Sequence, residues 1–339
     1  MRMRVYKMVA LVLVMSLVLA LAGCGGEENQ SAGDNQQAGE KPEKLDKVRI
    51  TLTTWPGYGP LFLARDKGFF KEEGLEEVEI SIIQGLAERK QALAGNKVDG
   101  MATTLDIETT LEDAGIPVTI IWALDDSYGG DGILAKKEIA GLKDLQGKTV
   151  ALDVGTTSHI FLLTALDKVG LSDSDITMVP VSSAGDAGAA FVAGKVDAAV
   201  TWEPWLTRGV NEGNGHLLIT SRETPGLIVD ALAFRKDYAD SHPREMQALV
   251  NGLAKAMNYF AENREDAVKI MAEGLDMKPD NFLAGIKLYN YEENVELFNG
   301  KIQETLNKAA DFYLEKEVIS KKPDTERMVD GSYLANVVK

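Results

Sequence analysis

The sequence predicts an α/β protein that contains two consecutive βαβαβ units. The first observation is an internal echo, in which ALAGNKVDGMATT at residues 92–104 is matched by FVAGKVDAAVTW at residues 191–202. Both stretches read as the end of a helix, a glycine stop, and a short buried strand that ends in polar residues. The second observation is that the order of strands, turns and helices upstream of each copy also repeats. This alternation predicts parallel sheets with helices on both faces, and ligands bound outside the carboxyl ends of the strands.

The first unit begins with an apolar-rich strand at residues 48–54. A turn with the sequence Gly57-Tyr58-Gly59-Pro60 follows, and it places proline at the start of a helix. That helix covers residues 61–67 and is stopped by Gly68. A second strand is predicted at residues 78–83. The first copy of the echo then completes the unit.

The second unit repeats this order. A strand is predicted at residues 149–154, followed by the turn Gly155-Thr156-Thr157-Ser158, whose hydroxyls are typical helix caps. A helix over residues 160–168 ends near Gly170, and a second strand covers residues 176–181. The two units therefore present two sets of strand ends to each other.

The chain after residue 234 is predicted to be helical. Two sets of apolar residues recur there at helical spacing, and such stripes are packing faces. The first set is Leu249, Val250, Leu253, Met257 and Phe260, and the second is Ile302, Leu306, Ala309 and Tyr313.

The N-terminus has the three parts of a secretory signal. Arg2, Arg4 and Lys7 form a basic start, and residues 8–22 are apolar but too short for a bilayer span. The tetrad Leu21-Ala22-Gly23-Cys24 resembles a bacterial lipobox, which implies cleavage before Cys24 and lipidation of its thiol. Up to residue 47 the chain is rich in Gly, Gln, Asn, Glu and Ser, and this composition predicts a flexible tether. We therefore expect an extracytoplasmic protein that is lipid-anchored to the cell membrane.

The formal net charge of −16 bears on possible partners. A surface of this sign repels nucleic acid and anionic headgroups, so we expect no nucleic-acid partner. Since charges are screened over about 8 Å at physiological salt, the net charge does not exclude an anionic ligand in a local site. We expect a monomer.

Five motifs together resemble the nitrate, sulfonate and taurine branch of transporter substrate-binding proteins, which is itself similar to the thiamine-pyrimidine synthases. The motifs are WPGYGPLFLA at 55–64, KGFF at 67–70, DDSYGGDG at 125–132, GTTSH at 155–159 and TWEPW at 201–205. The resemblance implies a type II, periplasmic-binding-protein-like fold of two lobes joined by crossover strands. It also implies that the lobes close on a small solute, which is passed to an ABC permease and its ATPase.

Apolar strands at residues 118–124, 133–136 and 227–234 mark where the chain would cross between the lobes. The predicted division is a signal peptide at 1–23, a lipidated cysteine and tether at 24–47, a first lobe at 48–135 together with 227–339, and a second lobe at 136–226.

Candidate ligand-binding residues lie on the strand-end loops, where aromatic rings, neutral hydrogen-bonding groups and acids collect. They are Trp55, Tyr58, Gln84, Thr103, Thr104, Asp126, Ser127, Asp131, Thr156, Thr157, Ser158, Asp186, Trp202, Glu203 and Asp230. Three alternatives stay open. Trp55 could be buried under the first helix, the hydroxyls at 156–158 could merely cap a helix, and Asp230 could meet a partner across the hinge instead of a ligand.

The acids favour a nitrogen-containing organic solute. A ligand with an amino or amidine-like group would satisfy them, while helix N-termini could take a sulfonate or carboxylate. No lysine or arginine occupies these loops, and Arg208 is the nearest. Taurine-like zwitterions, aliphatic sulfonates and amino-pyrimidines are the expected solute classes.

The alternative is an enzyme of the related pyrimidine-synthesis or menaquinone-pathway groups, for which His159 is a candidate. We predict no catalytic residue, metal or cofactor. The three histidines lack ligand spacing, and the chain has neither a Gly-x-Ser-x-Gly elbow nor a Gly-rich Lys loop.

Overall fold

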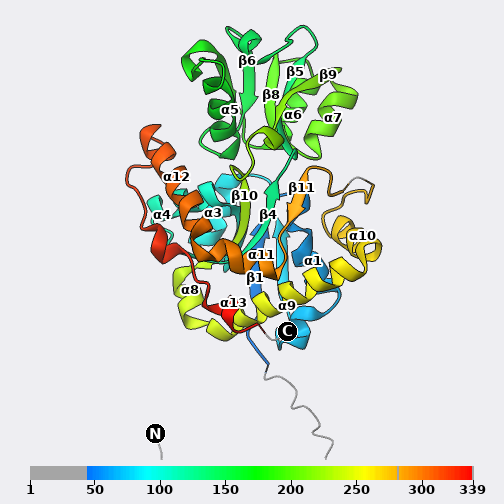
Figure 1. Ribbon diagram of the computed structural model, residues 1–339, viewed down its shortest axis with the longest axis vertical. Coiled ribbons are helices and arrows are strands. Elements are labelled where there is room, and N and C mark those ends of the chain that lie inside the picture. The colour runs from blue at the N-terminus through cyan, green and yellow to red at the C-terminus, as the bar shows by residue number, and fades with distance from the viewer. Residues whose placement is uncertain (1–43, 281, 338–339) are drawn as a thin grey trace, which may run out of the picture. The chain divides into compact units, whose positions relative to one another are not determined.

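A computed structural model describes residues 44–280 and 282–337 of the chain (Figure 1). The predicted signal peptide, the predicted lipidation of Cys24 and most of the predicted tether lie outside the described residues. In the part that is described, no helix combines the length and the apolar character needed to cross a bilayer.

The first sheet has six strands in the order β11-β4-β10-β3-β1-β2. Its strands are β1 (Val48–Leu52), β2 (Val78–Ile82), β3 (Gly100–Thr104), β4 (Val118–Ser127), β10 (Val229–Arg235) and β11 (Ile286–Leu288). β1 pairs in parallel with β2 and β3, whereas β10 runs antiparallel to β3 and β4. Every residue of β4 is buried, since the strand lies between β10 and β11 with helices on both faces.

The second sheet has five strands in the order β7-β6-β8-β5-β9. Its strands are β5 (Asp131–Lys136), β6 (Thr149–Leu152), β7 (Thr177–Pro180), β8 (Ala198–Trp202) and β9 (Gly215–Thr220). β6 pairs in parallel with β7 and β8, which repeats the β2-β1-β3 arrangement of the first sheet. The two copies of the sequence echo end in β3 and β8, so each copy occupies the same place in its own sheet.

The chain crosses between the sheets twice, from β4 to β5 and from β9 to β10 (Figure 1). Residues 128–130 make the first crossing and residues 221–228 the second. The predicted end of the first lobe at residue 135 therefore places β5 with the wrong sheet. Its backbone pairs with β8 and β9, and strand pairing of this kind is not visible in a short apolar run.

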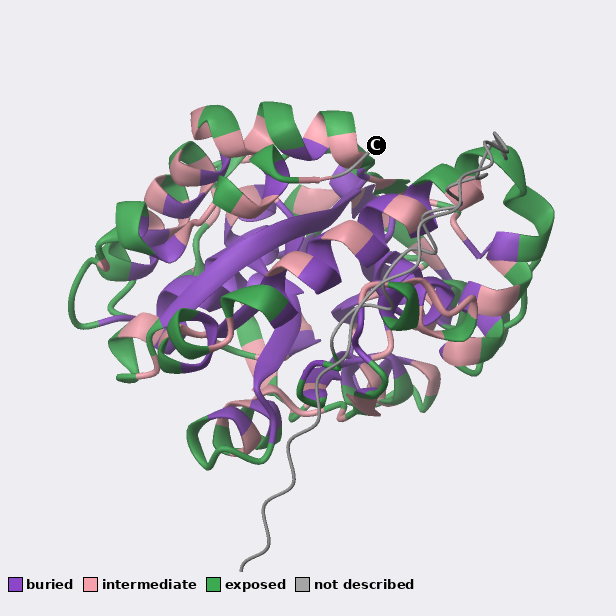
Figure 2. Cartoon of the chain, turned by 90° about the horizontal axis from the view of Figure 1, so that it is seen from below, coloured by how far each residue is buried: buried purple, intermediate pink, exposed green. Residues whose placement is uncertain are grey.

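Helices cover the sheets on both faces. They are α1 (Gly59–Asp66), α2 (Phe69–Glu72), α3 (Leu86–Ala94), α4 (Leu105–Asp113), α5 (Thr157–Asp167), α6 (Ala184–Val192), α7 (Trp205–Glu212), α8 (Lys236–Ser241), α9 (Pro243–Glu262), α10 (Arg264–Gly274), α11 (Tyr291–Glu296), α12 (Ile302–Glu315) and α13 (Ser332–Ala335), with a short 3-10 turn η1 at Pro56–Tyr58. Figure 2 shows buried strands between helices whose outer turns are exposed.

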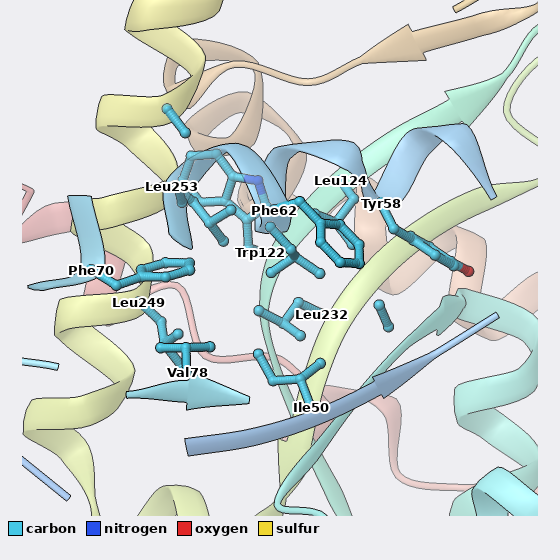
Figure 3. Packing of buried hydrophobic residues seen from close by; sticks show 14 of the residues in the cluster. Ile50, Tyr58, Phe62, Phe70, Val78, Trp122, Leu124, Leu232, Leu249 and Leu253 are labelled. Atoms are coloured by element: carbon cyan, nitrogen blue, oxygen red, sulfur yellow. The ribbon is translucent and has the colours of Figure 1, made fainter. Parts of the chain in front are cut away.

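The largest apolar cluster lies between the first sheet and helices α1, α2, α9 and α10. Trp122 of β4 is fully buried there and packs among Phe62, Leu249 and Leu253 (Figure 3). Tyr58 closes one side of this cluster and turns its hydroxyl away from it (Figure 3). The cluster thus holds the first strand-end loop in place.

The C-terminal region agrees only in part with the all-helical prediction. Both predicted stripes lie on helices, α9 and α12, and face the core. β11, however, is a short strand at the edge of β4, because three residues after the turn at Gly285 find the free edge of that strand. Tyr313 of α12 packs against Ile160 of α5, so the last long helix contacts the second lobe as well as the first.

Candidate functional site

A cavity opens where the carboxyl ends of the strands of the two sheets meet. It holds about 510 Å³ of empty space, counted with its mouth. The lining residues are Thr53, Trp55, Tyr58, Gln84, Leu86, Arg89, Thr103, Thr104, Ile107, Asp131, Asp153, Thr156, Thr157, Trp202, Ile228 and Asp230. Both sheets contribute, as the facing βαβαβ units predict.

Ten of the fifteen sequence-predicted residues line this cavity. They are Trp55, Tyr58, Gln84, Thr103, Thr104, Asp131, Thr156, Thr157, Trp202 and Asp230. Most of them follow the carboxyl ends of strands, whereas Asp131 and Asp230 stand at the starts of β5 and β10, which reach the same edge because they run antiparallel to their neighbours. Their roles in binding stay predictions.

The first loop is anchored by two buried acids. The indole nitrogen of Trp55 donates to both oxygens of Asp125 at 3.0 and 3.2 Å, and the hydroxyl of Tyr58 donates to Asp230 at 2.5 Å. Both aromatic side chains are less than 5% exposed. Trp55 is therefore buried and also borders the cavity. Asp230 lines the cavity and has a protein partner, but Tyr58 belongs to the same lobe and is not a partner across the hinge.

These acids differ from ordinary surface carboxyls. Burial raises the pKa of Asp125 well above its ordinary value, and the charge of Asp230, its partner across the β4–β10 ladder, raises that pKa further. Burial also raises the pKa of Asp230, against the lowering effect of the Tyr58 hydrogen bond. Asp131 has one carboxylate oxygen without a partner, and burial raises its pKa to about 7.

Hydrogen bonds join the two lobes at the cavity wall. The hydroxyls of Thr104 and Thr157 are 2.7 Å apart, and the Thr157 hydroxyl also lies 2.9 Å from an oxygen of Asp106. From the second lobe, the indole nitrogen of Trp202 donates to the carbonyl of Thr54 at 3.3 Å. The strand-end loops of the two lobes are therefore in direct contact.

The proposed capping role of the hydroxyls at 156–158 does not fit the local geometry. Thr156 precedes α5, but its hydroxyl donates back to the carbonyl of Asp153 at 2.7 Å and makes no cap hydrogen bond. Ser158 is buried and does not line the cavity.

Two predicted acids lie at helix starts outside the cavity. Asp186 is exposed in the first turn of α6 and accepts a hydrogen bond from Ser183 at 2.8 Å. Glu203 accepts from the backbone nitrogen and the hydroxyl of Thr207 at 3.1 and 2.8 Å, and so stabilises the start of α7. Acids are common at helix starts because they accept hydrogen bonds from the free backbone N–H groups there and interact favourably with the helix dipole. Sequence alone does not distinguish this capping role from ligand binding.

Asp126 and Ser127 also lie outside the cavity, at the crossing between the lobes. Burial raises the pKa of Asp126 to about 6, and a backbone N–H of Gly226 opposes that shift. The hydroxyl of Ser127 lies 2.8 Å from that of Ser221 on the returning crossing. Both residues therefore sit where the chain passes between the sheets.

Arg89 is the principal residue that the sequence prediction missed. It lies near the start of α3, is 4% exposed and lines the cavity, and its Nε and Nη1 have no hydrogen-bond partner. Burial lowers its pKa, while the nearby charges of Tyr58, Asp230, Asp153 and Glu108 raise it. Arg89 belongs to a helix and not to a loop, but it lines the cavity, so the prediction that Arg208 is the nearest arginine is wrong. A cation near a helix N-terminus opposes the helix dipole, and this signal could have singled it out.

Asp153 was also missed, although it directly follows β6. It lines the cavity, and burial raises its pKa to about 6. The cavity wall thus carries one guanidinium and the three carboxyls of Asp131, Asp153 and Asp230. His159, the residue that motivated the enzyme alternative, is buried in α5 and does not line the cavity.

Residues 41–274, more than half of the chain, match the NMT1-like family. The chain belongs to the NMT1-like family. A Bacillus subtilis (strain 168) protein, provisionally named as an aliphatic sulfonates-binding protein, is 27% identical to this NMT1-like chain over 335 residues. The match covers 97% of the chain and 96% of the relative.

Solved structures show the same fold at low identity. The alkanesulfonate-binding protein SsuA from Xanthomonas axonopodis pv. citri, bound to MOPS, superimposes with a TM-score of 0.70 at 20% identity, covering 85% of this NMT1-like chain and 99% of SsuA. The desulfurization enzyme DSZB gives a TM-score of 0.65 at 14% identity, with 85% and 98% covered. The predicted two-lobed α/β fold and the family resemblance are confirmed. Because both binding proteins and an enzyme have this fold, the fold by itself does not distinguish between the two functions.

Proposed function

We propose that this protein is the extracytoplasmic solute-binding component of an ABC importer. On this proposal its lobes close on a small organic solute that carries both an anionic oxygen group, such as a sulfonate, and a nitrogen group with N–H donors. The closed protein then delivers the solute to a membrane permease, whose ATPase partner supplies the energy. The names of the sulfonates-binding relative and of SsuA support the class of function.

The buried guanidinium of Arg89 carries the proposal for the solute. A buried guanidinium whose Nε and Nη1 have no hydrogen-bond partner is costly unless an anion completes it, and its fork matches the oxygens of a sulfonate or carboxylate. The carboxyls of Asp131 and Asp230 suit an ammonium or amino group at the other end of the same solute. Simple nitrate would use the first feature and leave the second without a partner.

A ligand screen tests this proposal. We expect taurine to raise the thermal midpoint more than ethanesulfonate, nitrate or an amino-pyrimidine does at equal concentration. Taurine present at 100 times its Kd would add about 2.7 kcal/mol to the free energy of unfolding. Asp230→Asn is expected to weaken taurine binding by tenfold or more, as loss of a charged hydrogen bond does. Glu203→Gln should leave it unchanged, because Glu203 supports α7 instead. A shift with nitrate alone, or equal effects of the two variants, would contradict the assignment.

The lipid anchor is part of the same proposal and rests on the N-terminal sequence. Cys24 is the only cysteine of the chain and follows the lipobox-like Leu21-Ala22-Gly23. We expect the full-length protein to sediment with membranes and to enter the detergent phase of a phase separation. The Cys24→Ser variant has no thiol to lipidate and so lacks the two acyl chains that stable anchoring needs. It should appear in the soluble extracytoplasmic fraction. Equal membrane association of both forms would refute lipidation at Cys24.

A further inference from the structure

The side-chain donors that line the cavity are mostly turned away from it. Each hydroxyl or indole has a single proton to donate, and protein acceptors already take these protons. Thr53 donates to Gln84 at 2.8 Å, Tyr58 to Asp230 at 2.5 Å, Thr156 to the Asp153 carbonyl at 2.7 Å, Trp55 to Asp125 at 3.0 Å, and Trp202 to the Thr54 carbonyl at 3.3 Å. The hydroxyl oxygens of Thr53, Tyr58 and Thr156 therefore have only lone pairs left to offer a solute. The two indoles have no lone pair to offer.

A buried chain of hydroxyls extends this pattern to Thr104. Asp106, 3% exposed and behind the cavity wall, accepts from the hydroxyl of Tyr313 at 2.6 Å and from that of Thr157 at 2.9 Å. Because Thr157 gives its proton to Asp106, it can only accept at the 2.7 Å contact with Thr104. The proton of Thr104 then points into the protein, and its oxygen presents lone pairs to the cavity.

The ionised form of Asp106 keeps this direction fixed. Burial raises the pKa of Asp106, whereas its hydrogen bonds with Tyr313 and Thr157 lower it. A carboxylate has acceptor sites for both of these donors, and it has no proton with which to reverse the chain. The geometry of the three hydroxyls thus suits a charged Asp106.

The position of Thr104 adds to the acid side of the cavity. In the β3–β10 ladder it stands directly opposite Asp230. One acceptor hydroxyl and one carboxylate at neighbouring points can each take an N–H of an ammonium or amino group, which has two or three such donors. A solute that presents a methyl group at this place would leave both acceptors without a partner.

We propose that the chain Thr104–Thr157–Asp106–Tyr313 makes Thr104 an obligate hydrogen-bond acceptor, and that this selects solutes with N–H donors over solutes of equal size without them. Asp106 is the positioning residue, since it acts through Thr157 and touches no solute. The inference rests on the proposed function and specifies the solute end that faces Asp230. Because Thr104 and Thr157 belong to different lobes, the acceptor is set when the lobes are in contact.

The test is the ratio of two dissociation constants, measured by calorimetry for taurine and for ethanesulfonate, which lacks the amine. The wild-type protein is expected to prefer taurine by tenfold or more, in line with loss of charged hydrogen bonds. Thr157→Val frees the Thr104 proton, so the ratio should fall to about threefold or less, chiefly through weaker taurine binding. Thr157→Ser should restore the wild-type ratio. Thr164→Val, the same substitution two turns further along α5, should leave it unchanged.

Asp106→Asn and Tyr313→Phe provide a second measurement. An amide at 106 can donate to Thr157 and reverse the chain, so Asp106→Asn should lower the ratio even where the fold is retained. Tyr313→Phe keeps Asp106 and should lower stability more than the ratio, by about 1 kcal/mol or more in unfolding free energy.

Each outcome is decisive. Equal ratios for Thr157→Val and Thr164→Val would overturn the inference and leave the proposed function standing. Equal wild-type affinities for taurine and ethanesulfonate would overturn the inference together with the nitrogen group of the proposed solute. If amino-pyrimidine binds and no sulfonate does, the sulfonate class is wrong, and the inference is judged on amino-pyrimidine against its N,N-dimethyl derivative. If no probe binds, both are refuted.

Discussion

Replacement of Arg89 with methionine is expected to weaken taurine binding by about a hundredfold or more. Removing one member of a buried, hydrogen-bonded charge pair costs about 2–5 kcal/mol, partly because the other charge loses its partner. Among the described residues that line the cavity, Arg89 is the only one with a guanidinium or ammonium, so no other side chain of that set can take over the anionic group. Calorimetric titration of the purified variant measures the effect.

Two matched variants separate the charge of Arg89 from its shape. Arg89→Lys keeps the charge but loses the planar fork, and we expect affinity between those of the wild type and the methionine variant. Lys90→Met removes the neighbouring cation, which donates to Thr110 at 2.6 Å and does not line the cavity. It should bind taurine as the wild type does. Binding by Arg89→Met within threefold of the wild type would rule out Arg89 as the anion site.

Asp131→Asn is expected to stabilise the solute-free protein, and to do so increasingly as pH rises. Burial raises the pKa of Asp131 from an ordinary 3.8 to about 7, so between these values the folded state binds more protons than the unfolded state. The stability contributed by Asp131 is therefore full below about pH 4 and falls until about pH 7. Asparagine has no such loss. The gain in unfolding free energy over the wild type should reach about 4 kcal/mol above pH 7.

Urea unfolding of both proteins from pH 4.5 to pH 8 measures this difference, and the other titrating groups cancel in it. Glu138→Gln serves as the control, because Glu138 is an exposed carboxyl just beyond the same strand. A difference in unfolding free energy that stays constant with pH, or that shrinks as pH rises, would contradict the conclusion that burial raises the pKa of Asp131. The same variant should bind taurine less well, so that stability would be gained at the expense of function.

The strands of both units are predictable from sequence because they are short, apolar and bounded by glycine. The predicted strand at 78–83 corresponds to Val78–Ile82, and that at 149–154 to Thr149–Leu152. The prediction failed for the pairing partners of a strand. β5 was assigned to the first lobe, but its hydrogen bonds to β8 and β9 place it in the second sheet. Pairing depends on residues more than 60 positions away, and no local pattern reports it.

The candidate site was predictable where it depends on strand ends and not where it depends on side-chain partners. Tyr58 and Thr104 were found because they follow or end strands, and Asp230 because an acid inside an apolar strand is costly to bury without a partner. Glu203 was misassigned because a helix start uses an acid in the same way as a ligand site would. Arg89 was missed because it lies inside a helix, where a charged residue ordinarily faces solvent.

The sequence by itself determined the repeated α/β architecture, the family resemblance and the edge at which the polar residues collect. These follow from hydrophobic period, turn residues and strand order, which are local properties of the chain. Only the tertiary structure decided which polar groups still have something to offer a solute. That depends on which donors and acceptors are already used: Arg89 keeps free N–H groups, while Thr104 and Tyr58 have given theirs to neighbours. Those neighbours come from distant segments, and hydrogen bonds between distant segments exist only once the chain has folded.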